Sequence, residues 1–428
     1  MIAVGLFGSS RFSKLRHRRR NISIQSLLMA NIVRLPAALA PLVIVLSEGS
    51  GKVALASGSF LVSGLTVGEI LLSSSFAKLG DKNPRFALVL LLMPLGLLWA
   101  VFGAISERGV RSSNFLVLLL IVFLVGGLGA GLFGVTRNLV VGVKQKDLDS
   151  PSLHRLLGFD MVLMEVFFLM APVIILVSIF LAGNSSVPWA TVGVVIVGIV
   201  FALVRLSRHH SPVEKDFSTS QLIRLDRPMR SKSVWRNKKA AWVFSASAAM
   251  GICEGGLIIS IPTLLVERNL SLRSAGIAVA LVSAGSIVGG SLTTRFSTLV
   301  AKPRIRIRLG VMLLGLGIGV VAVSSTHSLT GTLVTVFVTG LFVAPLNTTR
   351  ALAIEDLFTS DKMSEGFGAL YGAYSVGFGV VGLMLGLFSG QISAAGILIS
   401  LSFLAILVAL FLIFFASSPK LSNDSRPV

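Results

Sequence analysis

Two long stretches without a single Lys, Arg, Asp or Glu constrain this chain more than any other feature. They extend from Leu309 to Thr349 and from Gly366 to Pro419. A helix that crosses a bilayer needs about 20 apolar residues, so each stretch is too long for one span and must turn within itself. Small polar residues and Gly permit such turns. The sequence therefore predicts turns at Thr326-His327-Ser328 and Ser389-Gly390-Gln391, each between two membrane helices.

The composition indicates that most of the surface faces lipid. Of the 428 residues, 54% are hydrophobic and only 13% are charged, whereas a soluble domain carries about 25% charged residues. A net charge of +20 could suggest nucleic acid, but the basic residues lie in short clusters between apolar runs. No basic domain could fold alone, and nucleic acid is therefore excluded as a partner.

Apolar runs of membrane length recur along the whole chain. We expect an all-α membrane protein with twelve transmembrane helices, at residues 24–46, 53–76, 86–106, 114–136, 157–182, 188–206, 240–264, 275–296, 308–326, 331–353, 366–389 and 393–415. The predicted organisation is a basic cytoplasmic N-terminal segment (1–23), an N-terminal six-helix bundle (24–206), a basic cytoplasmic connector (207–239), a C-terminal six-helix bundle (240–415) and a cytoplasmic tail (416–428).

Lys and Arg concentrate on one side of the predicted helices. The few in predicted outer loops are Lys52, Arg108, Arg111, Arg268 and Arg273. An excess of Lys and Arg marks cytoplasmic loops, so we expect a multi-pass protein of the inner (plasma) membrane with both termini in the cytoplasm. The basic run at residues 11–20 is expected to lie against anionic lipid headgroups, either as a topology signal alone or as a specific lipid site.

The two halves of the chain repeat each other. The fourth predicted helix runs from Gly127 to Thr136-Arg137, and the tenth from Gly340 to Thr349-Arg350, with Thr-Arg at the inner end of both. Together with the equal number of spans on each side of the connector, this match indicates a duplicated six-helix bundle. Parallel repeats of this kind build one known transporter architecture, in which the substrate site lies between the halves near the membrane midplane.

The inner loop between the second and third helices carries the sharpest motif. Asp81, Lys82 and Arg85 match in type and spacing the signature Gly-x-x-x-Asp-Arg/Lys-x-Gly-Arg of the major facilitator superfamily, while Ala77 and Pro84 replace its glycines. The chain resembles that superfamily over nearly its whole length. The resemblance implies two pseudo-symmetric six-helix bundles, a secondary transporter, and an inner gate latched by this loop.

In the family, the Asp of this motif is held at the positive N-terminus of the eleventh helix, as helix-dipole physics supports. Here Glu365 lies at that terminus, and its like charge opposes the contact. We assign Arg137 and Arg350, at the inner ends of the fourth and tenth helices, to the same gate. The alternative is that all of these are ordinary inner-loop charges.

Ionisable residues inside membrane helices are costly and usually functional. The candidates here are Arg34, Glu69, Glu165 and Glu254. Arg34 and Glu254 align across the repeat with opposite charge, so we expect them to face the central cavity and neutralise each other in an occluded state. The alternative is neutralisation within one half, with Arg34 paired to Glu165 or Glu69. Asp160 is expected to lie nearer the inner end of its helix, at the interface.

No motif points to catalysis or to a bound cofactor. The sequence has no cluster suggestive of a metal site or a catalytic nucleophile, and no Gly-x4-Gly-Lys-Ser/Thr loop for a nucleotide. We therefore predict neither an enzyme nor a cofactor, and an ion gradient as the energy source. No His lies deep in a predicted span, so a proton carrier has to be a carboxylate.

The function predicted first is proton-coupled export of a small amphipathic compound, of the drug or metabolite efflux type. Arg34 would contact the substrate or a counter-charge, and Glu165 or Glu254 would carry the proton. Gly158 and Pro172 match two places of the superfamily's antiporter pattern, which implies export. Two alternatives stay open: proton-coupled uptake of an organic anion gripped by Arg34, and a non-transporting membrane sensor or assembly partner on the same scaffold.

Overall fold

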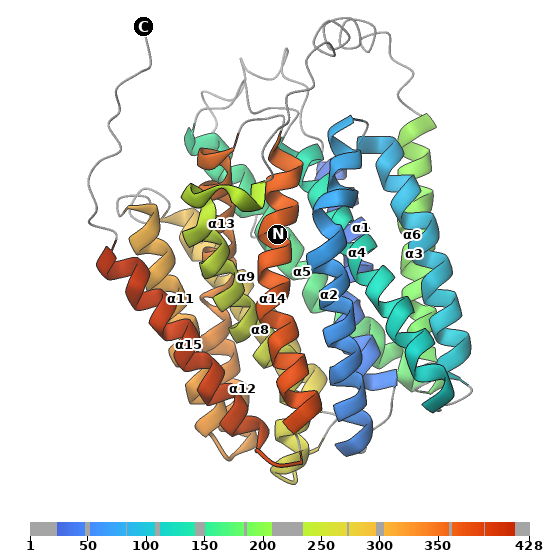
Figure 1. Cartoon of the computed structure of the whole chain (residues 1–428), viewed down its shortest axis with the longest axis vertical. Coiled ribbons are helices and arrows are strands. Elements are labelled where there is room, and N and C mark those ends of the chain that lie inside the picture. Colours follow the sequence, from blue (N-terminus) through green and yellow to red (C-terminus); the bar gives the residue numbers. More distant parts are fainter. Residues whose placement is uncertain are drawn as a thin grey trace, which may run out of the picture.

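Figure 1 shows the chain as a computed structural model. The structure describes residues 24–47, 52–82, 84–107, 112–141, 150–183, 186–207, 234–271, 274–296, 304–358, 362–388 and 390–415. Within these ranges the side chains of Asp81, Lys82, Arg85, Arg137 and Pro172 are outside the described part. The predicted N-terminal segment, tail and most of the connector are outside it too.

Every predicted span coincides with helical structure. The first half consists of α1 (Ile24–Ser47), α2 (Lys52–Lys82), α3 (Pro84–Ser106), α4 (Ser112–Val141), α5 (Ser150–Ala182) and α6 (Val187–Ser207). Two short 3-10 helices follow, η3 (Val234–Arg236) and η4 (Lys238–Ala240). The second half consists of α8 (Ala241–Glu267), α9 (Ser274–Arg295), α11 (Ile305–Ser325), α12 (Leu329–Gly340), α13 (Val343–Leu357), α14 (Met363–Phe388) and α15 (Ala394–Phe414). The prediction of an all-α membrane protein is confirmed.

Both predicted turns within the charge-free stretches are present. Helix α11 ends at Ser325 and α12 begins at Leu329, while α14 ends at Phe388 and α15 begins at Ala394. A serine precedes each new helix and accepts a hydrogen bond from the backbone N–H three residues later, at 3.1 Å for Ser328 and 3.2 Å for Ser393. Such a cap satisfies one of the free N–H groups that every helix start exposes.

The tenth predicted span is two helices rather than one. Helix α12 ends at Gly340, and α13 begins at Val343. Pro345 lies in the first turn of α13, where its ring removes one backbone donor and crowds the carbonyl of Leu341 four residues earlier. The break therefore falls where a continuous helix would be most strained.

The dimensions and surface of the helices suit a bilayer. Among the described residues, ten helices are long and apolar enough to cross a membrane, and the apolar stretches Ala30–Val45 and Val187–Leu203 are shorter. Large apolar side chains cover much of the exterior; the most exposed include Phe180, Leu181, Leu116 and Phe414. A soluble protein would not expose apolar surface on this scale.

Helices of the two halves meet along two long contacts. Helix α2 packs against α4 in its own half and against α14 in the other, and α5 packs against α9 (Figure 1). The contact of α2 with α14 is close because α14 presents glycines to it. A Cβ on Gly379 would lie 2.2 Å from Thr66 Oγ1, and one on Gly382 would lie 2.8 Å from the Ser59 carbonyl oxygen. We call this contact the α2–α14 seam.

Candidate functional site

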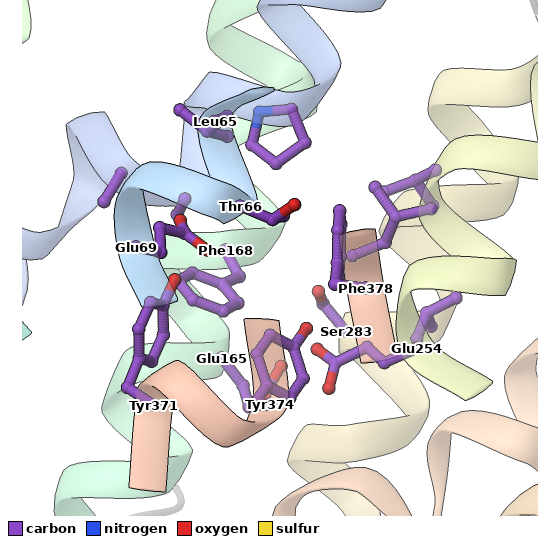
Figure 2. A pocket seen from close by; sticks show the side chains of 16 residues that line it. Leu65, Thr66, Glu69, Glu165, Phe168, Glu254, Ser283, Tyr371, Tyr374 and Phe378 are labelled. Carbon is purple, nitrogen blue, oxygen red and sulfur yellow. The ribbon is translucent and has the colours of Figure 1, made fainter. Parts of the chain in front are cut away.

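A cavity of about 60 Å³ lies between helices of the two halves. Its 16 lining residues come from α1, α2 and α5 of the first half and from α8, α9 and α14 of the second (Figure 2). A water molecule needs about 10–15 Å³ of such space, so the cavity has room for a few. We call it the central cavity.

Three of the four charged residues predicted inside the spans line the central cavity. They are Glu69 of α2, Glu165 of α5 and Glu254 of α8. All three are buried, with 6%, 2% and 5% of their surface exposed. Three acidic residues that the sequence singles out within its predicted spans therefore share one space, although they are far apart in the chain.

Hydroxyl groups of the second half lie beside each of these carboxylates. These hydroxyl groups belong to Ser375 beside Glu69, Ser286 beside Glu165 and Tyr374 beside Glu254. Figure 2 shows Tyr374 next to Glu254, with Tyr371 and Glu69 together at the opposite wall. The Oε1 atom of Glu165 is buried and has no hydrogen-bond partner among the described residues.

Charges around Glu254 come from two other helices. Glu254 and Glu165 repel each other, and Arg350 of α13 attracts Glu254. Among the described residues that line the central cavity, none is Lys, Arg or His. The cavity is therefore acidic, with a single cation close to one of its carboxylates.

Arg350 lies in a second cavity, of about 100 Å³, which adjoins the first. The two cavities share the lining residues Phe168, Glu254, Tyr371 and Tyr374. Arg350 donates a hydrogen bond to Asn347 Oδ1, and its guanidinium lies 5.6 Å from the centre of the Tyr374 ring. The cavity lies toward the end at which α1, α8 and α14 begin, which the sequence predicts to be cytoplasmic. We call it the inner cavity.

An aromatic row runs along α14 and reaches across to the first half. Phe133 of α4 stacks on Tyr371 with ring centres 4.5 Å apart and planes 16° apart. Tyr371 lies 5.7 Å from Tyr374, which lies 5.8 Å from Phe378. Phe133 therefore makes the direct aromatic contact between the halves, at the wall of the inner cavity.

Arg34 lines neither cavity, contrary to the expectation that it faces the centre. Its Nη1 atom lies 3.2 Å from both carboxylate oxygens of Asp160, and its Nε donates to Thr136 Oγ1 at 2.8 Å. Asn31 also donates to Asp160, at 3.2 Å. The counter-charge in this structure is thus Asp160, and not Glu254, Glu165 or Glu69.

Asp160, expected near the inner end of its helix, is buried within the protein. Its exposed fraction is 0%, and that of Arg34 is 1%. Helix α5 begins at Ser150 rather than at residue 157, which places Asp160 well inside the helix. The spacing of Asp160 and Glu165 already indicates that they face different ways, because residues five apart in a helix point about 140° away from each other. Asp160 and Glu165 therefore face different neighbours, and only Glu165 faces the central cavity.

The predicted gate is visible only in part. The side chains of Asp81, Lys82, Arg85 and Arg137 are outside the described residues, and Arg350 is buried in the inner cavity.

At the inner end of the α2–α14 seam, where α14 begins, Lys78 Nζ lies 3.3 Å from Glu365 Oε1. Ser73 Oγ donates to the Gly368 carbonyl one turn further in, at 3.3 Å. The acidic start of α14, expected to repel a carboxylate, is therefore paired with a lysine of the first half.

Comparisons with known proteins agree on the fold. The family model described as Major Facilitator Superfamily matches residues 22–336. The crystal structure of the human organic anion transporter MFSD10 (TETRAN) matches with a TM-score of 0.63 and 16% identity, over 91% of this chain and 98% of that one. A bacterial homologue of the iron transporter ferroportin, in an outward-facing state with soaked iron, matches with a TM-score of 0.61 and 15% identity, over 93% and 100%. No curated relative matches by sequence.

Proposed function

This chain belongs to the Major Facilitator Superfamily, and from that premise we propose that it exports a small molecule in exchange for protons. Membership makes it a secondary transporter of small molecules and not an enzyme. It also favours transport over the alternative of a non-transporting sensor. The identity of the substrate, the coupling ion and the direction are what the proposal adds.

The observation that carries the proposal is that three buried carboxylates from both halves converge on one cavity. A charged carboxylate away from water is costly unless it is paired. Only Glu254 has a cation that attracts it in the described part of the cavity walls. We therefore infer that Glu165 and Glu69 hold protons in the empty, closed state, and that protons leave when a substrate takes their place.

Exchange of protons for substrate would follow because both occupy the central cavity. Glu165 and Glu254 repel each other, so both are charged together only when something neutralises them. A site that holds either protons or substrate, and that opens alternately to each side, moves the two in opposite directions. Since the proton gradient across a plasma membrane is directed inward, such exchange drives the substrate outward.

We propose that the inner end of the molecule is the gate. Two contacts between the halves at this end would hold it closed, the Lys78–Glu365 pair and the Phe133–Tyr371 stack. The predicted gate residues of the loop and helix ends, Asp81, Lys82, Arg85 and Arg137, would join them, and Arg350 would line the path behind. Parting of the halves at this end would open the inner cavity first.

We retain the predicted placement of the chain in the membrane as part of the proposal. Both termini and residues 207–239 would be cytoplasmic, the bundles would be residues 24–206 and 240–415, and the basic run at 11–20 would contact anionic headgroups. The distribution of Lys and Arg supports this sidedness. The direction of transport does not depend on this placement, because an inward proton gradient drives the substrate outward whichever end of the molecule faces the cytoplasm.

A second candidate is uptake of an organic anion. The structurally similar MFSD10 is described as an organic anion transporter. In this chain Arg350 and Asn347 line the inner cavity and could bind a carboxylate. Arg34, the residue first predicted to grip an anion, is held by Asp160 instead. The acidic central cavity favours the first candidate.

A flux experiment tests the proposal. Purified protein is reconstituted in liposomes with an imposed pH gradient, and a panel of small cationic, neutral and anionic compounds is added while internal pH is recorded. At least one compound should collapse the gradient in the wild type. Glu165→Gln and Glu254→Gln should abolish this effect, because neither amide can carry a proton.

The matched control is Glu355→Gln, which changes an acidic residue of α13 that lines neither cavity. It should leave the proton flux intact. Transport of a compound without any proton movement, or proton movement that persists in both cavity variants, would refute proton exchange. Uptake of an anion together with protons would establish the second candidate.

A further inference from the structure

We infer that the substrate is an organic cation with an apolar or aromatic body, held by Glu254 and Glu165 among the rings of the central cavity. This inference rests on the proposed function, because it names what the protons are exchanged for. It is carried by the charge of the cavity, by its aromatic walls and by an acceptor without a partner. An anionic substrate would instead require positive charge and hydrogen-bond donors in the cavity.

The charge balance of the central cavity favours a cation. Glu69, Glu165 and Glu254 line it, and no described lining residue is basic. The first cation nearby, Arg34, is already paired with Asp160. The second, Arg350, attracts Glu254 from the adjoining cavity. A cationic substrate would neutralise a carboxylate that otherwise needs a proton, whereas an anion would meet the charge of Glu254 and could not replace the protons on Glu165 and Glu69.

Two polar groups of the wall offer unused acceptor atoms to the cavity. Glu165 is 2% exposed, and its Oε1 atom accepts no hydrogen bond from any residue in the described part of the chain. Thr66 donates its hydroxyl hydrogen to the Ser63 carbonyl at 2.8 Å, which leaves only lone pairs for the cavity. These two acceptors match the N–H groups of an ammonium or amidinium, while the hydroxyls of Ser283, Tyr371 and Tyr374 in the same wall can also donate.

Four aromatic side chains form part of the remaining wall, beside aliphatic ones. Phe168, Tyr371, Tyr374 and Phe378 line the same cavity as the carboxylates (Figure 2). Ring faces attract cations placed within about 6 Å, and more strongly where water is excluded. Arg350 already lies 5.6 Å from the Tyr374 ring, which shows that one face of this ring accepts a cation. The other rings would hold the apolar body of the substrate.

Two shape-matched ions of opposite charge test the inference directly. Purified wild-type protein in detergent is titrated with tetraphenylphosphonium and with tetraphenylborate, and the shift in thermal unfolding temperature and the Kd are measured. We expect the phosphonium to stabilise the protein and the borate not to. Glu254→Gln should weaken phosphonium binding about tenfold or more, because it removes a negative charge close to the bound cation in a site of low dielectric.

Further variants separate contact from misfolding. Glu254→Asp keeps the charge and should bind more tightly than Glu254→Gln. Tyr374→Leu removes the ring and should weaken binding about two- to fivefold, the value of one cation–π contact. Glu355→Gln is the control and should bind as the wild type does. All variants are first checked for a monodisperse profile.

Three outcomes would overturn the inference: borate binding as tight as phosphonium binding, phosphonium affinity unchanged in both Glu165→Gln and Glu254→Gln, or no phosphonium binding to folded protein. Because no gradient is present, binding is judged apart from exchange. Intact binding without proton flux in liposomes would remove export and leave the cation site. Proton flux driven only by anionic or neutral compounds would leave exchange and remove the cation.

Discussion

Arg34 and Asp160 form an ion pair at 3.2 Å in the interior of the first half, with exposed fractions of 1% and 0%. The pair joins α1 to α5, and Thr136 and Asn31 add hydrogen bonds to it from α4 and α1. The two charges therefore neutralise each other without a contribution from the second half. We infer that the pair holds the first bundle together, and we keep the transport chemistry of the proposal for the acids of the central cavity.

The first prediction is that Arg34 and Asp160 are energetically coupled. Arg34→Met or Asp160→Asn alone should destabilise the protein by about 3–5 kcal/mol, because each strands a buried charge. The double variant should lose less than the sum of the two. The measurement is a double-mutant cycle on thermal stability and folded yield.

A parallel cycle with Arg34→Met and Glu254→Gln tests the pairing first expected from the repeat. Its losses should add to within about 0.5 kcal/mol, since the two residues share no contact in the described structure. Strong coupling of Arg34 to Glu254, and none to Asp160, would mean that the pair rearranges across the cavity during transport.

The second prediction concerns close approach in the α2–α14 seam. Gly379→Ala would place a Cβ 2.2 Å from Thr66 Oγ1. Overpacking of this kind costs about 1–3 kcal/mol, so we expect lower stability and slower transport. Thr66→Ala in the same chain removes the clashing oxygen and should restore part of both. Thermal unfolding and liposome flux are the readouts.

Gly390→Ala is the matched control, because a Cβ there would meet nothing within 4 Å. It should behave as the wild type does. Equal stability of Gly379→Ala and Gly390→Ala would show that the seam is looser than the structure indicates.

The spans were predictable because each is a property of one segment. A helix that spans a bilayer needs about 20 apolar residues and few charges. The charge-free stretches Leu309–Thr349 and Gly366–Pro419 are each long enough for two such helices. The turns at Thr326–Ser328 and near Gly390 follow from the same count. The break before α13 carried a local signal as well, in Pro345, which the hydrophobic pattern alone does not register.

The partner of Arg34 was not predictable in the same way. Alignment of the repeats placed Arg34 and Glu254 at equivalent positions, but equivalence fixes depth and not the direction in which a helix faces. Which neighbour Arg34 meets depends on the rotation of α1 against α5, and that is set by packing. Glu69, Glu165 and Glu254 line one cavity, as expected for charged residues in spans, which face the interior of a bundle or a water-filled space. Their part in transport stays a prediction.

The third prediction concerns Lys78 and Glu365 at the inner end of the seam. Lys78→Glu should weaken the closed inner gate, and Lys78→Glu with Glu365→Lys should restore it. Lys78 is 55% exposed, so the pair is worth about 0.2–1 kcal/mol and the shift should be only a few-fold. The measurement is labelling of a cysteine introduced in the inner cavity, in a Cys253→Ala background.

Salt provides the control for this pair. Surface charges are screened over about 8 Å at physiological ionic strength, so high salt should reduce the difference between Lys78→Glu and the wild type. Labelling rates that are equal in all variants at low salt would remove the pair from the gate. Asp81→Asn, compared with Asp361→Asn, tests the predicted latch residue separately.

The fourth prediction is the topology. Ser220→Cys in a Cys253→Ala background should resist impermeant thiol reagents in intact cells and react after the cells are opened. The expectation rests on the Lys and Arg of residues 207–239, which mark a cytoplasmic segment. Rapid labelling in intact cells would invert the sidedness and place the predicted inner gate at the outer face.

The fifth prediction concerns the stack of Phe133 on Tyr371, which lies in the wall of the inner cavity between α4 and α14 and is part of the proposed gate. Phe133→Leu keeps an apolar side chain but removes the ring. An aromatic pair is worth about 0.5–1.5 kcal/mol beyond its buried area, so the population open at the inner end should rise about two- to tenfold. The rise is measured by labelling of the same inner-cavity cysteine.

Phe133→Tyr is the conservative comparison, because it keeps the ring face that stacks on Tyr371. It should label at the wild-type rate, and Tyr371→Leu should reproduce Phe133→Leu. Adding Tyr371→Leu to Phe133→Leu should then change little, since one deletion already breaks the stack. Independent, additive effects of the two leucines would show that each ring acts through other neighbours and that the stack does not hold the gate.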